Sequence, residues 1–164
     1  QVTVFLLHGA AVAGGLGMAC AGDMVIASRE TAMGLSETSI GIVPAQIAPF
    51  VVERVGPFKA RYIMLTSQRF TAIEGAEWGL VDFLVDDVEA AETTLAGIQK
   101  DVRRCAPGAN AGTKVLLEEM KHLKAPQIVA LAADAFADSV RAGEGKEGVA
   151  SFLEKRKPDW ALKD

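Results

Sequence analysis

The sequence contains few of the residues on which metal sites and disulfide frameworks depend. Its 164 residues include 2 cysteines and 2 histidines. Cys20 and Cys105 form no CxxC pair, and His8 and His122 stand alone, so no metal-ligand spacing is present. Cys20 lies in an apolar helical pattern, which predicts a small core residue. We therefore expect no metal, and the cysteine usage fits a reducing compartment.

An excess of positive charge is also lacking. The 17 lysines and arginines are outnumbered by 21 acidic residues, which argues against a nucleic-acid partner. The one dense basic cluster, at 155–157, is typical of a solvated helix end. No apolar run reaches the roughly 18 residues of a membrane span, and the start lacks the basic region of a signal peptide. Because the chain begins inside an apparent strand, we expect further protein upstream of Gln1.

Hydrophobic patterning predicts one α/β core followed by helices, consistent with a hydrophobic content of 50%. A turn is expected at 9–13 and a linker-like break at 107–112. The proposed boundary divides a core at 1–105 from a helical module at 106–164. Strands are expected at 2–7, 24–27, 32–35, 40–43 and 80–85, and helices at 14–21, 47–55, 58–65, 71–78, 88–104, 113–123, 126–141 and 146–156.

The segment GAAVAGGLGMACAGD, at 9–23, places three glycines where a buried helix is expected to begin. The phosphate-binding patterns GxGxxG and GxxxxGK[ST] are absent, and so is the GxSxG nucleophile elbow. Two interpretations remain open. The turn either presents a backbone N–H to a carbonyl oxygen, as an oxyanion hole does, or serves packing alone.

Glu37 is the next unusual residue, because it stands between the apolar segments that contain Leu35 and Ile40. A carboxylate in this setting is either a turn or capping residue or a group that transfers protons. An oxyanion site beside one carboxylate suits proton transfer next to a carbonyl through an enolate.

Four segments in order resemble the crotonase (enoyl-CoA hydratase/isomerase) superfamily. The first segment, HGAAVAGGLGMACAGDMVIAS, is similar to the oxyanion turn and helix of the family, and the second, AMGLSETSIGIVPA, to its second catalytic segment. The third, LTSQRFTAIEGAEWGLVDFLV, resembles the family stretch LTG…A-x-x-A-x-x-x-GLV. The fourth, EGVASFLEKRKPDW, resembles the family ending EG-x-x-AF-x-EKR-x-P-x-W. The resemblance implies the ββα spiral core of the ClpP/crotonase fold without its N-terminal portion, with module 106–164 serving trimerisation and CoA contact.

The resemblance also implies roles for individual residues. Gly14 matches the glycine whose N–H donates to the thioester oxygen, with the helix dipole adding stabilisation. Glu37 matches the second of two family glutamates. Phe152 and Lys155 match positions that contact CoA of a neighbouring subunit. The remaining substrate- or CoA-binding positions are Ala13, Gly15 and Pro44.

Two departures from the family pattern narrow the function. Gly17 stands where the first family glutamate is expected. After Pro44, the residues AQIAP at 45–49 replace the GAGG that is usual in the family. Single-glutamate hydratases of branched glutaconyl-CoA thioesters, namely isohexenylglutaconyl-CoA and methylglutaconyl-CoA hydratases, look similar at both places. The resemblance therefore implies a lyase that hydrates an enoyl-CoA. The alternatives are a Δ3,Δ2-enoyl-CoA isomerase and an inactive truncated or assembly member.

The resemblance extends to partners and compartment. It implies an acyl-CoA substrate, with coenzyme A entering as part of the thioester and no tightly bound cofactor. It also implies a homotrimer or a dimer of trimers, no nucleic acid, no membrane, and a location in the cytoplasm, or in the mitochondrial matrix of a eukaryote. The upstream part of a family chain supplies the second oxyanion N–H.

Overall fold

The computed structural model describes residues 1–141 and 143–162, which form two compact units. The sheet unit is Thr3–Gly97, and the helical unit is Gln1–Val2 together with the chain from Ile98 onward. This division falls inside helix α4 (Val88–Arg104), whereas the sequence places the boundary after that helix. The assignment of CoA contact and trimerisation to 106–164 stays a prediction.

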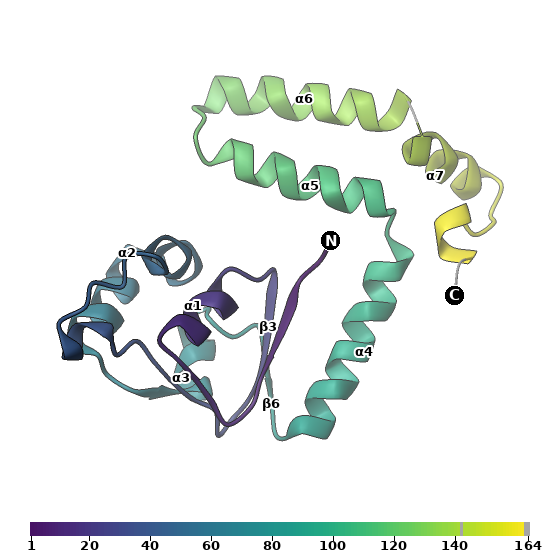
Figure 1. Cartoon of the computed structure of the whole chain (residues 1–164). Coiled ribbons are helices and arrows are strands. Elements are labelled where there is room, and N and C mark those ends of the chain that lie inside the picture. Colours follow the sequence, from purple (N-terminus) through teal and green to yellow (C-terminus); the bar gives the residue numbers. More distant parts are fainter. Residues whose placement is uncertain (142, 163–164) are drawn as a thin grey trace. The chain divides into compact units, whose positions relative to one another are not determined.

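The sheet unit contains two three-stranded sheets, in the orders β1-β3-β6 and β2-β4-β5. All pairings are parallel except β4 with β5. Figure 1 shows α1 and α3 on one side of the β1-β3-β6 sheet, with α2 beyond them. The elements are β1 (Val4–Leu7), β2 (Ala10–Val12), α1 (Gly14–Cys20), β3 (Met24–Ser28), β4 (Ala32–Gly34), η1 (Glu37–Ile40), α2 (Ala48–Thr66), β5 (Phe70–Thr71), α3 (Ala72–Glu77), β6 (Phe83–Val85) and α4.

One apolar core joins these elements. Leu16 of α1, Val25 of β3 and Met33 of β4 are completely buried, and Val51 of α2 is buried with them. Cys20 belongs to the same cluster, so its predicted place in the core is confirmed. The central strand β3 is buried from Val25 to Ser28, as expected for the middle strand of a parallel sheet, whereas β1 is half-buried.

Two local backbone features agree with the sequence. Thr71 and Glu74 have the three-residue spacing of a capping box and form one: the Thr71 hydroxyl accepts from the Glu74 amide, and the Glu74 carboxylate accepts from the Thr71 amide. In α2, Gly56 has φ 76° and ψ 163°, so the helical backbone is interrupted at the position where the sequence predicted a break.

Three local predictions are wrong. The segment 9–13, expected as a turn, contains β2, which is only three residues long and too short to show periodicity. The segment 40–43, expected as extended, instead begins with the last residue of the 3-10 helix η1 and continues through the left-handed Gly41. The segment 107–112, expected as a linker-like break, is the first part of helix α5. Proline is tolerated in the first turn of a helix, as at Pro107, and the alanines of this segment favour helix formation.

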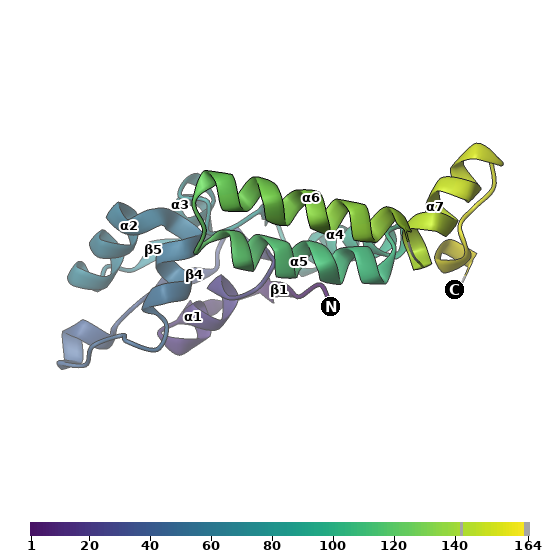
Figure 2. The same ribbon diagram turned by 90° about the horizontal axis from the view of Figure 1, so that it is seen from above.

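The helical unit consists of helices that follow one another along the chain. Helices α5 and α6 run side by side in Figures 1 and 2. The Trp160 indole N–H donates to the Arg104 carbonyl at 3.1 Å, which ties the end of the chain to the end of α4. The remaining elements of this unit are α5 (Pro107–Met120), α6 (Ala125–Arg141), α7 (Gly143–Leu153) and η2 (Asp159–Leu162).

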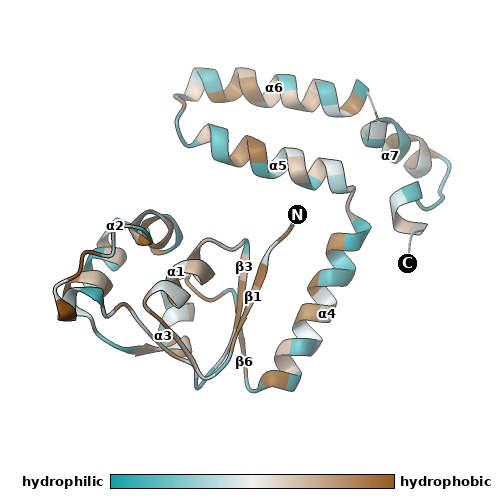
Figure 3. Ribbon diagram, in the orientation of Figure 1, coloured by the Kyte–Doolittle hydropathy of each residue, from teal (hydrophilic) through white to brown (hydrophobic). Residues whose placement is uncertain are grey.

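Apolar side chains on α5 and α6 are largely exposed. Figure 3 shows hydrophobic residues along both helices, and Leu117 is 58% and Phe136 71% exposed. Among the described residues, no helix combines the length and the apolar character needed to cross a membrane.

Candidate functional site

Two parallel strands bring Gly14 and Glu37 to the same edge of a sheet. Strand β2 pairs in parallel with β4, with Val12 opposite Gly34. Gly14 begins α1 two residues after β2 ends, and Glu37 begins η1 three residues after β4 ends. The Ala13 amide donates to the Gly34 carbonyl at 2.8 Å and extends the pairing to this edge. Carboxyl ends of parallel strands are where ligands commonly bind in α/β folds.

The turn before α1 is strained at Ala13, which has φ 49° and ψ −129°. Non-glycine residues rarely adopt this conformation, and such strain concentrates at functional sites. The Ala13 carbonyl accepts from the Gly17 amide at 3.1 Å. Gly14 follows as the first residue of α1, where a helix has no carbonyl of its own to receive the amide hydrogen.

The glycines of this turn have two different physical reasons. A Cβ atom built at Gly14 or Gly15 would meet no heavy atom within 4 Å, so packing among the described residues does not require glycine there. A Cβ atom at Gly17 would stand 2.2 Å from Ile47 Cγ2 and 2.5 Å from Ile47 Cβ. Gly17 is therefore a packing glycine, whereas Gly14 and Gly15 face open space.

Glu37 carries a buried polar atom that no group satisfies. Within the part of the chain that the structure describes, its Oε2 is shielded from solvent and has no hydrogen-bond partner. Such atoms are rare in folded proteins and call for an explanation such as a ligand or a catalytic role. A capping role does not account for this atom, because the backbone carbonyl of Glu37, not its carboxylate, accepts from the Ile42 amide at 2.9 Å.

The turn that carries Glu37 is held by its neighbours. Leu35, two residues before it, is only 1% exposed and anchors the end of β4. Thr38, the next residue, donates through Oγ1 to the Met64 carbonyl at 2.6 Å and lies 2.7 Å from Ser67 Oγ. These bonds connect η1 to the end of α2 and restrict where the Glu37 side chain can go.

Pro44 supports the start of α2. Its carbonyl accepts from the Ile47 amide at 3.2 Å and from the Ala48 amide at 2.9 Å. Farther along α2, the Arg54 guanidinium donates to the carbonyls of Gly22 and Leu80 at 3.2 Å each. These contacts fix α2, and with it Ile47, against the elements around α1.

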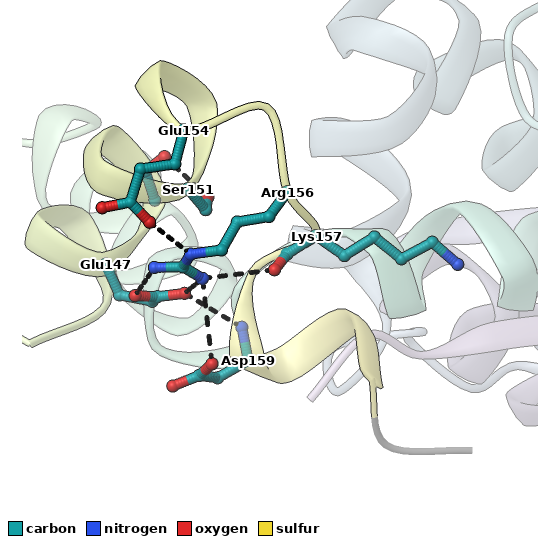
Figure 4. A network of polar contacts seen from close by, with 7 residues as sticks. Glu147, Ser151, Glu154, Arg156, Lys157 and Asp159 are labelled. Atoms are coloured by element: carbon teal, nitrogen blue, oxygen red, sulfur yellow. Dashed lines mark hydrogen bonds and ion pairs between the residues drawn. The ribbon is translucent and has the colours of Figure 1, made fainter.

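Phe152 and Lys155 lie in the helical unit. Phe152 is 81% exposed, and Lys155 is exposed with φ 55°. The next residue, Arg156, donates from Nη2 to the Glu147 carboxylate at 2.8 Å and from Nε to Glu154 at 2.6 Å (Figure 4). These bonds fix the backbone that follows α7, and the side chains of Phe152 and Lys155 take no part in them.

Two other kinds of chemistry find no support in the described residues. No group of three or more histidine, cysteine, aspartate or glutamate side chains among them could hold a metal ion. Burial raises the pKa of Cys20 to about 11, against the opposing influence of Arg54. The Cys20 thiol is therefore protonated at neutral pH and is a poor nucleophile.

Sequence reasoning missed Thr38 and Ile47. No sequence pattern marks Thr38, because its hydrogen-bond partners are a backbone carbonyl and a serine far along the chain. The contact of Ile47 with α1 has one signal in the sequence: the glycine at position 17, inside a buried helix, indicates that another group approaches the backbone closely. The sequence does not say which group that is.

Comparison with known proteins places the chain in a family. A model of the enoyl-CoA hydratase/isomerase family matches residues 1–163, and the chain belongs to that family. The solved structure of AtuE from Pseudomonas aeruginosa is 46% identical with a TM-score of 0.94, covering 98% of this chain and 62% of AtuE. An enoyl-CoA hydratase/isomerase from Marinobacter aquaeolei is 40% identical with a TM-score of 0.93, covering 98% of this chain and 61% of its own.

The fold is the α/β crotonase-like fold, as the resemblance implied. The enoyl-CoA hydratase ACTT6 of Alternaria alternata is 32% identical over 153 residues, which are 93% of this chain and 51% of that protein. A hydratase-family protein of Thermus thermophilus is 35% identical over 156 residues, or 95% of this chain and 61% of its own length. The chain thus spans between about half and three fifths of these relatives.

Proposed function

We propose that the protein hydrates an α,β-unsaturated acyl-CoA thioester, with Glu37 as its single acid/base and the Gly14 amide as an oxyanion donor. The observation that carries the proposal is the buried and unpartnered Oε2 of Glu37. Glu37 and Gly14 follow the same ends of the paired strands β4 and β2, and the open space at Gly14 supports the pairing of the two groups.

Each group has a defined task in this reaction. The Gly14 N–H polarises the thioester carbonyl and stabilises the enolate oxygen that develops. The Glu37 carboxylate accepts a proton from water while the water oxygen bonds to the β carbon. It then returns a proton to the α carbon as the enolate collapses, so one water is added and Glu37 is regenerated.

The departures from the family pattern at Gly17 and at residues 45–49 support a branched glutaconyl-type acyl group, which we propose as the substrate. We also propose Phe152 and Lys155 as contacts to CoA. Exposure of both side chains supports contact with a ligand or another subunit. The exposed apolar side chains of α5 and α6 support assembly into a trimer or a dimer of trimers.

An enoyl-CoA isomerase is the second candidate, and the single carboxylate is the observation that favours it. One carboxylate suffices to remove a proton and return it to another carbon. Product analysis separates the two reactions: a β-hydroxyacyl-CoA from a conjugated thioester supports hydration, whereas double-bond migration without uptake of water supports isomerisation.

The decisive experiment is Glu37→Gln in the full-length protein. We expect kcat for hydration to fall by about 10²–10⁴-fold with little change in stability, because the amide keeps the shape but cannot transfer the proton. Glu30→Gln, at an exposed turn residue, is the matched control and should leave activity unchanged. Unchanged hydration by the Glu37 variant would refute the assignment. An unsubstituted protein inactive on glutaconyl and crotonyl thioesters would favour the inactive or assembly interpretation.

A further inference from the structure

We infer that Ile47 is a specificity-determining residue, which fills the space beside Gly17 and forms an apolar wall for the branch on the β carbon of the substrate. The inference rests on the proposed function and deepens it. It is carried by the contact between Gly17 of α1 and Ile47, the residue that precedes α2.

The contact leaves no room for a side chain at position 17. A Cβ atom there would approach Ile47 Cγ2 to 2.2 Å, Cβ to 2.5 Å and Cδ1 to 3.3 Å. Real Cβ contacts are not this short, so any larger residue at 17 would force Ile47 to move. Loss of a carboxylate at position 17 would leave a hole, but here a hydrocarbon side chain fills the space.

Ile47 cannot move away easily. Its amide donates to the Pro44 carbonyl, and its own carbonyl accepts from the Val51 amide at 3.1 Å. Its side chain packs against the buried core but remains partly exposed. One part of Ile47 is thus anchored, and the other is available to a ligand.

The position of Ile47 relative to the site follows from helix geometry. Residues three apart lie on the same face of a helix, so Gly17 lies on the face of Gly14. The Ile47 side chain therefore packs on the side of α1 on which position 14 faces open space, one helical turn farther along the helix. The β carbon is two bonds beyond the thioester carbon, and its substituent would meet this hydrocarbon surface.

This arrangement has a chemical consequence. An apolar wall next to the β carbon favours a methyl or larger alkyl branch and offers no second proton-transfer group. Methylenes in hydrophobic pockets change selectivity by roughly 10–200-fold. The substrate class selected by Ile47 is therefore a thioester branched at the β carbon.

The test compares 3-methylglutaconyl-CoA with glutaconyl-CoA, which differ by one methyl group. In the full-length protein, Ile47→Ala should lower the ratio of kcat/KM for the branched over the unbranched thioester by about tenfold or more. Val55→Ala is the matched control, because Val55, a residue of α2, is also a partly buried aliphatic residue that packs on the core, and its ratio should stay unchanged.

Binding and stability make the inference independent of turnover. Dissociation constants of both thioesters are measured for Glu37→Gln with and without Ile47→Ala, and the methyl preference should fall with Ile47→Ala. Gly17→Ala should lower the melting temperature, and adding Ile47→Gly, which removes the clashing atoms, should restore part of it.

The outcomes separate the two proposals. No hydration of either thioester by the unsubstituted protein overturns the proposed function. Hydration with an unchanged methyl preference in Ile47→Ala, in rates and in binding, overturns the role of Ile47 and leaves the proposed function standing. A Gly17→Ala protein as stable as the unsubstituted one overturns the steric contact.

Discussion

The sheet unit and the helical unit bury their apolar residues to very different extents. Every buried hydrophobic residue among the described residues, except Ala106, lies in the sheet unit. In the helical unit, the described parts of α5 and α6 contain no buried residue, while Leu117 and Phe136 are exposed. The sheet unit thus has an apolar core of its own, whereas helices α5 and α6 expose apolar side chains.

Under the proposed function, this difference would separate two tasks. Proton transfer needs a carboxylate held within a fraction of an ångström, and a packed core provides that rigidity. Contact with CoA or with another subunit needs exposed side chains, which the helical unit provides. Four measurements test the contrast, beginning with the largest expected effect.

The two cysteines report on the two units separately. Cys20 is buried in the sheet unit with its pKa raised to about 11, and Cys105 is exposed in the helical unit. We expect a thiol reagent to modify Cys105 rapidly and Cys20 at least about 10³-fold more slowly, because Cys20 becomes accessible only when the core opens. Labelling rates at pH 8 for Cys105→Ser and Cys20→Ala isolate each thiol. In 8 M urea, where both thiols are accessible, the two labelling rates should be equal. Equal rates in the native protein would mean that the core opens freely.

Matched leucines compare the packing of the two units. Leu16→Ala, at a side chain with 0% exposure, should lower the free energy of unfolding by about 2–5 kcal/mol. Leu117→Ala, at a side chain 58% exposed, should change it by no more than about 0.5 kcal/mol. Urea unfolding at two protein concentrations measures both. A loss for Leu117→Ala that equals the other and depends on concentration would show that another copy covers this face.

Much of the sheet unit could be predicted from its sequence. The start of α1 at Gly14, the capping box at Thr71 and the full extent of α4 follow from local signals that act over a few residues. These features depend on backbone preferences and on hydrophobic period, which a sequence displays directly.

The contacts that define the candidate site could not be predicted. Gly17 and Ile47 meet through packing across thirty residues of chain, and Thr38 bonds to a backbone carbonyl in a distant helix. The burial of one Glu37 oxygen depends on the surrounding elements together. In the helical unit, the glycines at 108 and 112 suggested a linker, but Pro107 in the first turn and the helix-forming residues that follow begin α5.

Matched threonines compare helix ends with helix interiors. Thr71→Ala in the sheet unit should cost about 1 kcal/mol, because it removes the acceptor for the Glu74 amide. Thr113→Ala in the helical unit should cost nothing measurable, because its hydroxyl only donates to the Ala109 carbonyl four residues earlier and alanine is the better helix former. Thermal unfolding monitored by circular dichroism measures both. Equal losses would contradict the capping assignment.

The smallest expected effect is an acid-dependent loosening of the helical unit. The hydrogen bond from Arg156 is the main cause that lowers the pKa of Glu147 below its ordinary value of 4.5. Because the folded-state pKa is lowered, this pair stabilises the fold fully above pH 4.5 and less as the pH falls through the folded-state pKa. Glu147→Gln should therefore lower the melting temperature slightly at pH 7 and flatten its fall below pH 4.5, whereas Glu119→Gln, at an exposed residue of α5, should do neither. The same acid dependence in Glu147→Gln and in the unsubstituted protein would remove Glu147 as its source.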